Sequence, residues 1–328
     1  MENPRIFKFP YLRILLILFS TGTVSAQQLP LFSVYRDQSG VLNPASISGN
    51  YLLNEMNYSI GASYRRQWMD LKDGPNTQVV NFEYIPKERD ELITGGHIIR
   101  DQTGKIGQTG IYGRFAYRLE LGRRVDHALS IGIGAGLVQY RAKLNDIRFA
   151  EPEISDLDKP NVLYPDFSLG VYYYYSDKLY AGISVPQTFG LSTVYRDTSG
   201  SRAFDIRRVQ HLYGVVGGYF DVEWFGSSTS FIEPSLWIRY VPRGPVSLNF
   251  NARYQISDFY WFGLGGGVGM GSPVSSALHL ETGMKLGESL NILNSQWTIA
   301  FAYDVPLGKY RSFLGNIFEV SVVYSWFD

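Results

Sequence analysis

The sequence predicts an all-β fold: a transmembrane, antiparallel up-and-down β-barrel, expected to have 14 strands and to follow a cleaved signal peptide. The first observation is a period of two, clearest from Val246 to Ile256, where apolar residues alternate with Ser, Asn, Arg and Gln. Such alternation gives a strand one apolar and one polar face. The second is strand length: most segments run near ten residues, as a bilayer-crossing strand requires, whereas strands of the alternative, a soluble β-sandwich, average about five or six.

Composition narrows the class of protein further. The 328 residues include 30 Lys+Arg and 30 Asp+Glu, so the formal net charge is zero. A nucleic-acid-binding protein normally carries an excess of basic residues. We therefore expect this protein to bind no nucleic acid. There is no cysteine, which excludes disulfides, thiolate metal sites and cysteine nucleophiles. Charged residues make up only 18% of the chain and aromatic residues 15%, which is unlike a soluble domain with about 25% charged residues.

The first 26 residues have the pattern of a secretory signal peptide. Three basic residues precede the apolar run 14–19, and Val24-Ser25-Ala26 is a small-x-small cleavage site. The alternative, an N-terminal membrane anchor, would need about 20 apolar residues rather than this short run. We therefore expect residues 1–26 to be removed and the protein to be exported to the bacterial outer membrane.

Residues 27–55 lack the alternation of the rest of the chain. They contain Pro30, Asn43-Pro44 and Gly49. Proline lacks the amide donor that a strand ladder needs, and a closed barrel has no free edge to accommodate it. We predict that residues 27–55 form no barrel strand but fold into or under the lumen, as a plug or a periplasmic contact, and that residues 56–328 form the barrel.

Turn signals divide the barrel region into an even number of strands, as expected of an outer-membrane barrel. The expected strands lie near 55–65, 77–85, 92–100, 108–120, 127–139, 166–175, 178–185, 208–220, 230–241, 245–256, 258–270, 276–287, 295–305 and 316–327. The long connections, Arg141–Pro165 and Pro186–Arg207, follow the fifth and seventh strands. They should therefore emerge at the same end, opposite the short turns.

Three residue types are expected at particular places on this barrel. Glycines on the polar faces predict a crowded lumen: Gly132, Gly134, Gly136, Gly263 and Gly265. Aromatic residues near strand ends predict interfacial girdles: Trp68, Tyr172–Tyr175, Tyr260, Trp261 and Trp326. Lumenal arginines could form a charged pore ring or bind a plug: Arg65, Arg114, Arg118, Arg239 and Arg253. In the last strand, an outward apolar stripe runs from Phe318 to Trp326.

No catalytic motif is present. The sequence contains no H-E-x-x-H, no G-x-x-x-x-G-K-[ST] and no G-x-S-x-G. Its four histidines, His97, His127, His211 and His279, are spread over different strands or strand ends. The acidic stretch Glu151–Asp158 could ligate Ca²⁺, but its spacing is not that of an EF-hand, and a solvated loop is preferred. We expect no catalytic, cofactor-binding or metal-binding residues, and no cofactor.

Several motifs, in order along residues 31–186, resemble the PorP/SprF family of the type IX secretion system. The N-terminal part carries Leu31-Phe32, Tyr35, Leu42-Asn43-Pro44-Ala45, Arg65, Gln67-Trp68 and Gly74-Pro75-Asn76-Thr77-Gln78. The middle carries Asp101, Lys105-Ile106-Gly107, Tyr117-Arg118, Pro165-Asp166-Phe167, Gly170, Tyr172-Tyr173-Tyr174 and Tyr180–Pro186. The final strand is consistent, although Asp328 extends it beyond the usual terminal aromatic.

The resemblance implies a non-enzymatic outer-membrane barrel of the secretion and gliding apparatus. It implies that the barrel binds or anchors secreted proteins with C-terminal secretion domains, such as surface adhesins. It further implies coupling to periplasmic components, including a peptidoglycan-binding lipoprotein, and contact with outer-membrane lipid. Candidate partner-binding residues are in the N-terminal segment and the second long connection: Leu42, Asn43, Pro44, Tyr195, Arg196, Arg202 and Phe204.

The alternative function is a diffusion porin or small-solute transporter. Fourteen strands about 4.8 Å apart and tilted by about 40° would enclose a cylinder roughly 28 Å across. That width is ample for a pore unless the lumen is filled.

Overall fold

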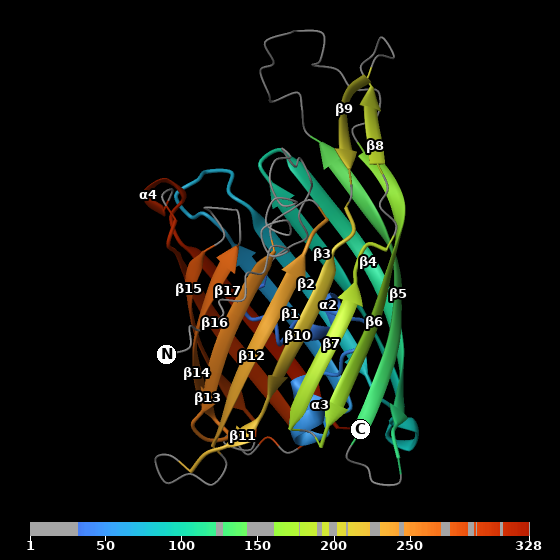
Figure 1. The fold of residues 1–328 in the computed structure, drawn as a ribbon, viewed down its shortest axis with the longest axis vertical. Coiled ribbons are helices and arrows are strands. Elements are labelled where there is room, and N and C mark those ends of the chain that lie inside the picture. The colour runs from blue at the N-terminus through green and yellow to red at the C-terminus, as the bar shows by residue number, and fades with distance from the viewer. Residues whose placement is uncertain are drawn as a thin grey trace, which may run out of the picture.

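Fourteen antiparallel strands close into a single barrel, as the alternation predicts (Figure 1). The computed structural model describes residues 32–122, 127–142, 161–176, 178–188, 192–196, 202–207, 209–223, 230–242, 246–269, 276–287, 292, 294–308 and 311–327. The expected signal peptide and the acidic stretch Glu151–Asp158 lie outside these residues, so both remain predictions.

Each strand of the barrel pairs with the next strand along the chain. The strands are β1 (Tyr58–Arg66), β2 (Asn76–Tyr84), β3 (Leu92–Thr103), β4 (Ile106–Glu120), β5 (His127–Ala142), β6 (Asn161–Tyr175), β7 (Leu179–Val185), β10 (Leu212–Gly218) with its short continuation β11 (Phe220–Asp221), β12 (Phe231–Tyr240), β13 (Ser247–Gln255), β14 (Tyr260–Gly269), β15 (Ala277–Leu286), β16 (Ser295–Pro306) and β17 (Ile317–Trp326). Pairing of β1 with β17, from Tyr58 opposite Trp326 to Arg66 opposite Phe318, closes the barrel.

Both long connections leave the barrel at the same end, but they differ from the predicted lengths. Strand β5 continues to Ala142 and β6 begins at Asn161, so these strands take residues from the expected loop. The second connection contains an antiparallel hairpin, β8 (Ser192–Arg196) and β9 (Arg202–Arg207), which rises beyond the barrel (Figure 1). β-Branched and aromatic residues favour extended backbone in these two short runs.

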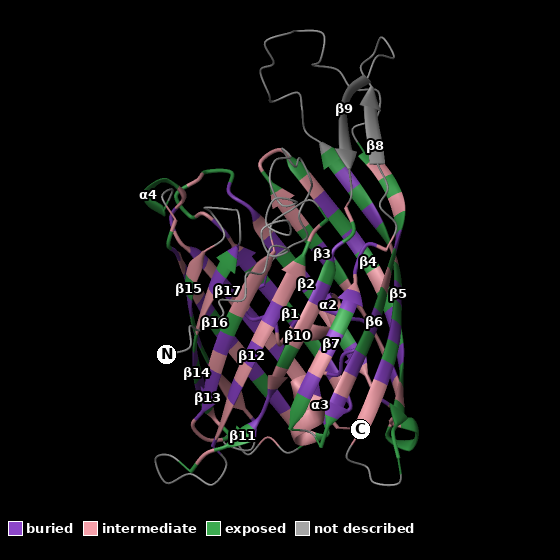
Figure 2. Ribbon diagram, in the orientation of Figure 1, coloured by how far each residue is buried: buried purple, intermediate pink, exposed green. Residues whose placement is uncertain are grey.

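Burial alternates along the strands, as the period of two requires (Figure 2). Ile111 and Ile133, on the outer face, are 58% and 56% exposed. Inward residues of the last strand, such as Glu319 and Ser321, are buried, while the predicted stripe from Phe318 to Trp326 faces out. Within the described residues, no helix is long and apolar enough to cross a membrane.

The aromatic girdle is only partly as predicted. Trp326 stacks on Tyr58 with the ring centroids 5.1 Å apart, and both lie at the end of the barrel that carries short turns. However, Tyr172, Tyr174 and Trp261 are buried in the lumen and belong to no girdle. Their inward direction follows from strand geometry, because adjacent residues of a strand point to opposite faces.

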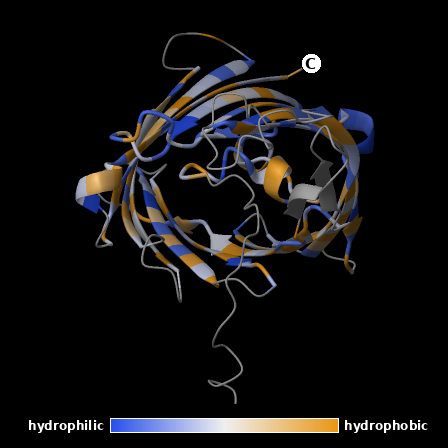
Figure 3. Ribbon diagram, turned by 90° about the horizontal axis from the view of Figure 1, so that it is seen from above, coloured by the Kyte–Doolittle hydropathy of each residue, from blue (hydrophilic) through white to orange (hydrophobic). Residues whose placement is uncertain are grey.

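Residues 32–57, which we call the lumenal segment, pass inside the ring of strands (Figure 3). They include the short helices α2 (Ser39–Leu42) and α3 (Gly49–Asn54). Apolar residues of the segment pack on inward residues of the wall: Phe32, Tyr35 and Leu42 form one buried cluster with Val79, Ile99, Tyr213 and Trp237. Two further helical turns among the described residues, η1 (Lys87–Arg89) and α4 (Arg311–Leu314), lie in connections between strands.

Candidate functional site

The lumenal segment is attached to the barrel wall in two places, which are chemically unlike each other. One attachment, the charged anchor, joins Ser33 and Arg36 to acidic residues of strands β12 to β17. The other, the glycine anchor, seats Asn43-Pro44-Ala45 on glycines of strands β5 to β7. Together they hold both ends of α2.

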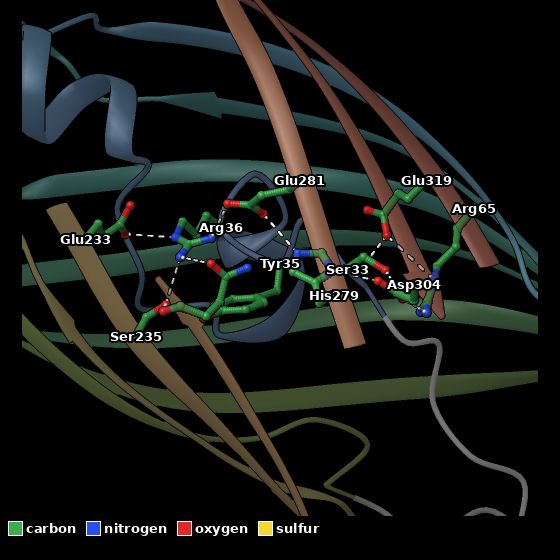
Figure 4. A network of polar contacts seen from close by, with 11 residues as sticks. Ser33, Tyr35, Arg36, Arg65, Glu233, Ser235, His279, Glu281, Asp304 and Glu319 are labelled. Carbon is green, nitrogen blue, oxygen red and sulfur yellow. Dashed lines mark hydrogen bonds and ion pairs between the residues drawn. The ribbon is translucent and has the colours of Figure 1, made fainter. Parts of the chain in front are cut away.

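Arg36 is the centre of the charged anchor (Figure 4). Its Nε lies 3.1 Å from Oε1 of Glu233, and its Nη1 lies 3.1 Å from Oε1 of Glu281. Nη2 donates hydrogen bonds to Ser235 Oγ at 2.9 Å and to Asn251 Oδ1 at 3.1 Å. These partners belong to β12, β13 and β15, so one buried guanidinium crosslinks three strands.

Electrostatics keeps this guanidinium charged. Burial alone would lower the pKa of Arg36, but the carboxylates of Glu233 and Glu281 outweigh burial and raise the pKa well above its ordinary value. Removing one partner of a buried ion pair typically costs about 3–5 kcal/mol, because the other charge is left without compensation. The anchor is therefore sensitive to the loss of Arg36.

Ser33 extends the charged anchor to the last strands. Its backbone amide donates to Glu319 Oε2 at 2.6 Å, and its hydroxyl donates to Asp304 Oδ2. Arg65 of β1 compensates both carboxylates, with Nη2 3.1 Å from Asp304 and Nε 3.7 Å from Glu319. The lumenal segment therefore binds two carboxylates, Asp304 and Glu319, that Arg65 of the barrel wall already compensates.

His279 joins the two halves of the charged anchor. Its Nδ1 contacts Asp304 at 2.6 Å, and its Nε2 contacts Glu281 at 3.2 Å. The sequence did not single out this histidine, because Asp304, which is 25 residues away, comes opposite it only when β15 pairs with β16. Nor did it single out the acidic residues, although alternation alone puts Glu281 and Glu319 on inward positions, which is the signal that could have found them.

In the glycine anchor, the turn Asn43-Pro44-Ala45 packs against glycines of the wall, which have no side chain. A Cβ at Gly170 would lie 2.0 Å from Oδ1 of Asn43, and one at Gly132 would lie 2.4 Å from the amide nitrogen of Ala45. Real Cβ atoms do not approach so closely, so side chains at these two wall positions would displace the turn. Gly182 adds a third bare position, where a Cβ would meet Asn43 Nδ2 at 3.0 Å.

Hydrogen bonds fix the turn on this bare patch. Asn43 Nδ2 donates to the carbonyl oxygens of Val171 and Ile183, both at 3.2 Å, and Ser184 Oγ donates to the carbonyl of Leu42 at 2.7 Å. Oδ1 of Asn43 meanwhile accepts from the amide of Ala45 at 2.9 Å. This local bond is typical of an Asx turn, in which the side chain mimics a backbone turn.

The sequence explains why α2 ends at this turn. Asn43 has φ −142° and ψ 114°, an extended conformation that the following proline imposes on the residue before it. Arg114 of β4 then holds the chain beyond the proline, donating from Nη1 to the carbonyls of Pro44 at 3.1 Å and Ser46 at 2.8 Å. Arg114 is itself ion-paired with Glu83.

The predicted partner-binding residues lie in two separate places. Leu42, Asn43 and Pro44 contact the inner wall of the barrel. In the hairpin, the backbone of Tyr195 pairs with Phe204. Arg196 pairs with Arg202, and the side chains of all four hairpin residues lie outside the described part of the structure. Contact with a partner stays a prediction for all seven residues.

The lumenal arginines form no shared ring around an open pore. Arg65 and Arg253 pair with wall carboxylates, and Arg118 pairs with Asp90 near the short turns. Arg239 lies over the ring of Trp237, 5.1 Å from its centroid. The sequence left two roles open for these arginines, a charged pore ring or binding of a plug. The contacts of Arg114 with Pro44 and Ser46 fit plug binding. Among the described residues, no group of three or more His, Asp or Glu is arranged to hold a metal ion.

An apolar outer face, a polar lumen and an even number of antiparallel strands define an outer-membrane β-barrel, here with chain inside the lumen. Residues 24–324 match the family described as type IX secretion system membrane protein PorP/SprF, and the chain belongs to that family. The resemblance read from the motifs is thereby confirmed. Membership places the protein in the outer membrane and associates it with the components and cargo of that system.

Solved structures show the same fold at low sequence identity. The CymD monoaromatic hydrocarbon channel is 11% identical with a TM-score of 0.53, over 90% of this chain and 94% of that one. The Pseudomonas putida toluene transporter TodX is 8% identical with a TM-score of 0.52, over 93% of this chain and all of that one. No curated protein sequence matches the chain.

Proposed function

We propose that this protein is a non-enzymatic scaffold of the type IX secretion and gliding apparatus. It binds or anchors secreted surface proteins that carry C-terminal secretion domains, and it couples them to periplasmic components. In this proposal the lumenal segment is a plug, and the long connections at the opposite end from the short turns are the contact surface for cargo.

The observation that carries the proposal is the pair of anchors inside the lumen. The charged anchor buries Arg36 among carboxylates of three strands, and the glycine anchor depends on wall positions without side chains. A diffusion pore needs neither feature, since its lumen must let solutes pass. In this barrel the lumenal segment binds to the inner surface of the wall. Such a barrel fits a role in binding other proteins at its ends.

Single-channel conductance of the purified barrel tests the plug. The wild type is expected to show no large ohmic conductance, while deletion of Gln27–Gly49 is expected to open a stable conductance. A large conductance in the wild type would contradict the proposal and favour a pore. If the deletion opened no conductance and left partner binding intact, the segment would be neither plug nor contact.

Loop replacement tests the contact surface for cargo. Residues 143–160 and residues 186–207 are each replaced by a short Gly-Ser turn, and capture of a secreted C-terminal domain is measured with the purified variants. We expect capture to fall at least tenfold for one of them. The control replaces the short connection 241–246 at the same end. Undiminished capture by both variants would remove these connections from the mechanism.

A second candidate function is small-solute transport. It is favoured by the fold shared with the channels CymD and TodX, whose names describe transport of monoaromatic hydrocarbons and of toluene, and by a cavity in the lumen. Uptake of such a solute into vesicles that contain the barrel, at a rate above that of empty vesicles, would support this candidate over the scaffold.

A further inference from the structure

A cavity of about 490 Å³ lies at the short-turn end of the barrel, between α3 of the lumenal segment and the ends of the strands. Figure 1 shows α3 and the C-terminal end of the chain at this end. Short turns of outer-membrane barrels face the periplasm, so the cavity belongs to that side. Its volume is within the range of about 300–1,000 Å³ that is usual for ligand sites.

Neighbouring strands supply one part of the cavity wall. Glu120 of β4 pairs with Ala128 of β5, and Ala128 pairs with Tyr174 of β6. All three line the cavity, so carboxylate, methyl group and aromatic ring follow one another along the wall. Leu52 of α3 and Phe327, next to the C-terminus, add further apolar surface. The wall therefore combines apolar side chains with an acidic group.

Acidic residues outnumber basic residues at this cavity. The acids are Glu55, Asp90 and Glu120, and the bases are Lys87 and Arg118. Arg118 is paired with Asp90 at 2.5 Å, and Lys87 is engaged as well. Within the described part of the chain, the carboxylates of Glu55 and Glu120 make neither a hydrogen bond nor an ion pair. The cavity therefore has two negative charges that no basic side chain compensates.

The backbone is unusual at two residues that line the cavity. Glu55 has φ 54° and Ser176 has φ 48°, both in the left-handed region that residues other than glycine, asparagine and aspartate rarely adopt. Glu55 follows α3 at the position where glycine is usual. Strained backbone of this kind is found most often at functional sites. A glutamate where glycine would fit better is consistent with a use for its carboxylate.

These features match a cation on an apolar stem. The two carboxylates compensate the charge, and the aromatic and aliphatic wall covers the stem. Arginine and lysine side chains have this form. Glu55, Glu120 and Ser176 are exposed at the end of the barrel, so such a side chain can enter while it is carried on another protein.

We propose that the cavity between Glu55, Glu120 and Tyr174 binds an arginine or lysine side chain of a periplasmic protein. This inference rests on the proposed coupling to periplasmic components, and it names the place and the chemistry of that contact. The charge of the cavity selects a basic partner segment over an acidic one.

Peptide binding to the full-length barrel in detergent tests the charge. The probe is a fluorescein-labelled heptapeptide with two arginines among glycines and serines. The matched peptide has citrulline in place of both arginines, which keeps the side-chain shape and removes the charge. Fluorescence anisotropy is expected to show binding of the arginine peptide that is about tenfold tighter or more. Equal binding of the two peptides, or binding of neither, would overturn the proposal.

Three variants test the place. Glu55→Gln and Glu120→Gln should each weaken binding of the arginine peptide, and Ala128→Trp should block the cavity without changing its charge. The matched control is Glu88→Gln, because Glu88 is an exposed glutamate at the same end that does not line the cavity. Thermal unfolding confirms that each variant is folded. Binding that is as tight in all three variants as in the control would overturn the proposal.

Cargo capture separates this inference from the scaffold role. The long connections lie at the opposite end of the barrel, so Glu55→Gln and Glu120→Gln should capture a secreted C-terminal domain as the wild type does. Lost discrimination between the peptides with cargo capture intact would refute the cavity alone, whereas the loop replacements described above test the scaffold independently.

Discussion

The two anchors of the lumenal segment hold the same chain by opposite means. The charged anchor works through what the wall carries, since Arg36 is bound by carboxylates and amides of three strands. The glycine anchor works through what the wall lacks, since Gly132 and Gly170 leave room for the turn. The charged anchor should therefore be weakened when a charged side chain is removed. The glycine anchor should be weakened when a side chain is added to one of its glycines.

The largest effect is expected from Arg36→Met. Glu281 would lose its arginine while Glu233 keeps Arg253, so the loss should lie near the low end of the range for a broken buried pair, about 3 kcal/mol. Hydrogen–deuterium exchange of the amides of residues 32–57 should then become roughly 100-fold faster.

The control for this change is Arg89→Met. Arg89 is a 64% exposed side chain that pairs with Glu91 at a turn, and exposed pairs contribute about 0–1 kcal/mol. Exchange in the lumenal segment should be the same in this control as in the wild type. Equal exchange rates in Arg36→Met and Arg89→Met would show that the charged anchor does not hold the segment.

A smaller effect is expected from Gly132→Ala. The new Cβ would lie 2.4 Å from backbone of the turn, and overpacking of this kind costs about 1–3 kcal/mol. Exchange of the amides near Ala45 should become about tenfold faster or more. Gly113→Ala on the neighbouring strand is the matched control, because a Cβ there would meet nothing within 4 Å. If the two alanine variants behaved alike, close packing at Gly132 would not be what seats the turn.

The smallest effect is expected from Asp37→Asn, which measures the cost of burying a carboxylate next to Arg36. Burial raises the pKa of Asp37, while Arg253 lowers it less. The folded state therefore binds this proton at a higher pH than the unfolded state, and the stability it contributes is lost as pH rises through the folded pKa. Asp37→Asn should accordingly stabilise the barrel in urea unfolding at neutral pH, with the gain vanishing below the ordinary carboxyl pKa. A gain that persisted unchanged at acidic pH would contradict this.

Local patterns predicted most of the barrel. The alternation from Val246 to Ile256 marks β13, and the stripe from Phe318 to Trp326 marks β17, because a period of two is a property of neighbouring residues. The predicted glycine crowding is also confirmed at Gly132, where the lumenal segment occupies the space that a side chain would need. The hairpin β8–β9 was missed because its two runs are short and lie inside what was expected to be a long loop.

The sequence by itself determined the strands, their faces, the outer-membrane class and the family, since alternation, turn residues and short motifs are all local. Only the tertiary structure decided which residues the inward-facing charged side chains pair with. Arg36 meets Glu281, 245 residues away, and Ser33 meets Glu319, 286 residues away. Closure of the barrel brings such residues together, and strand register sets which ones meet, so no local pattern carries that information.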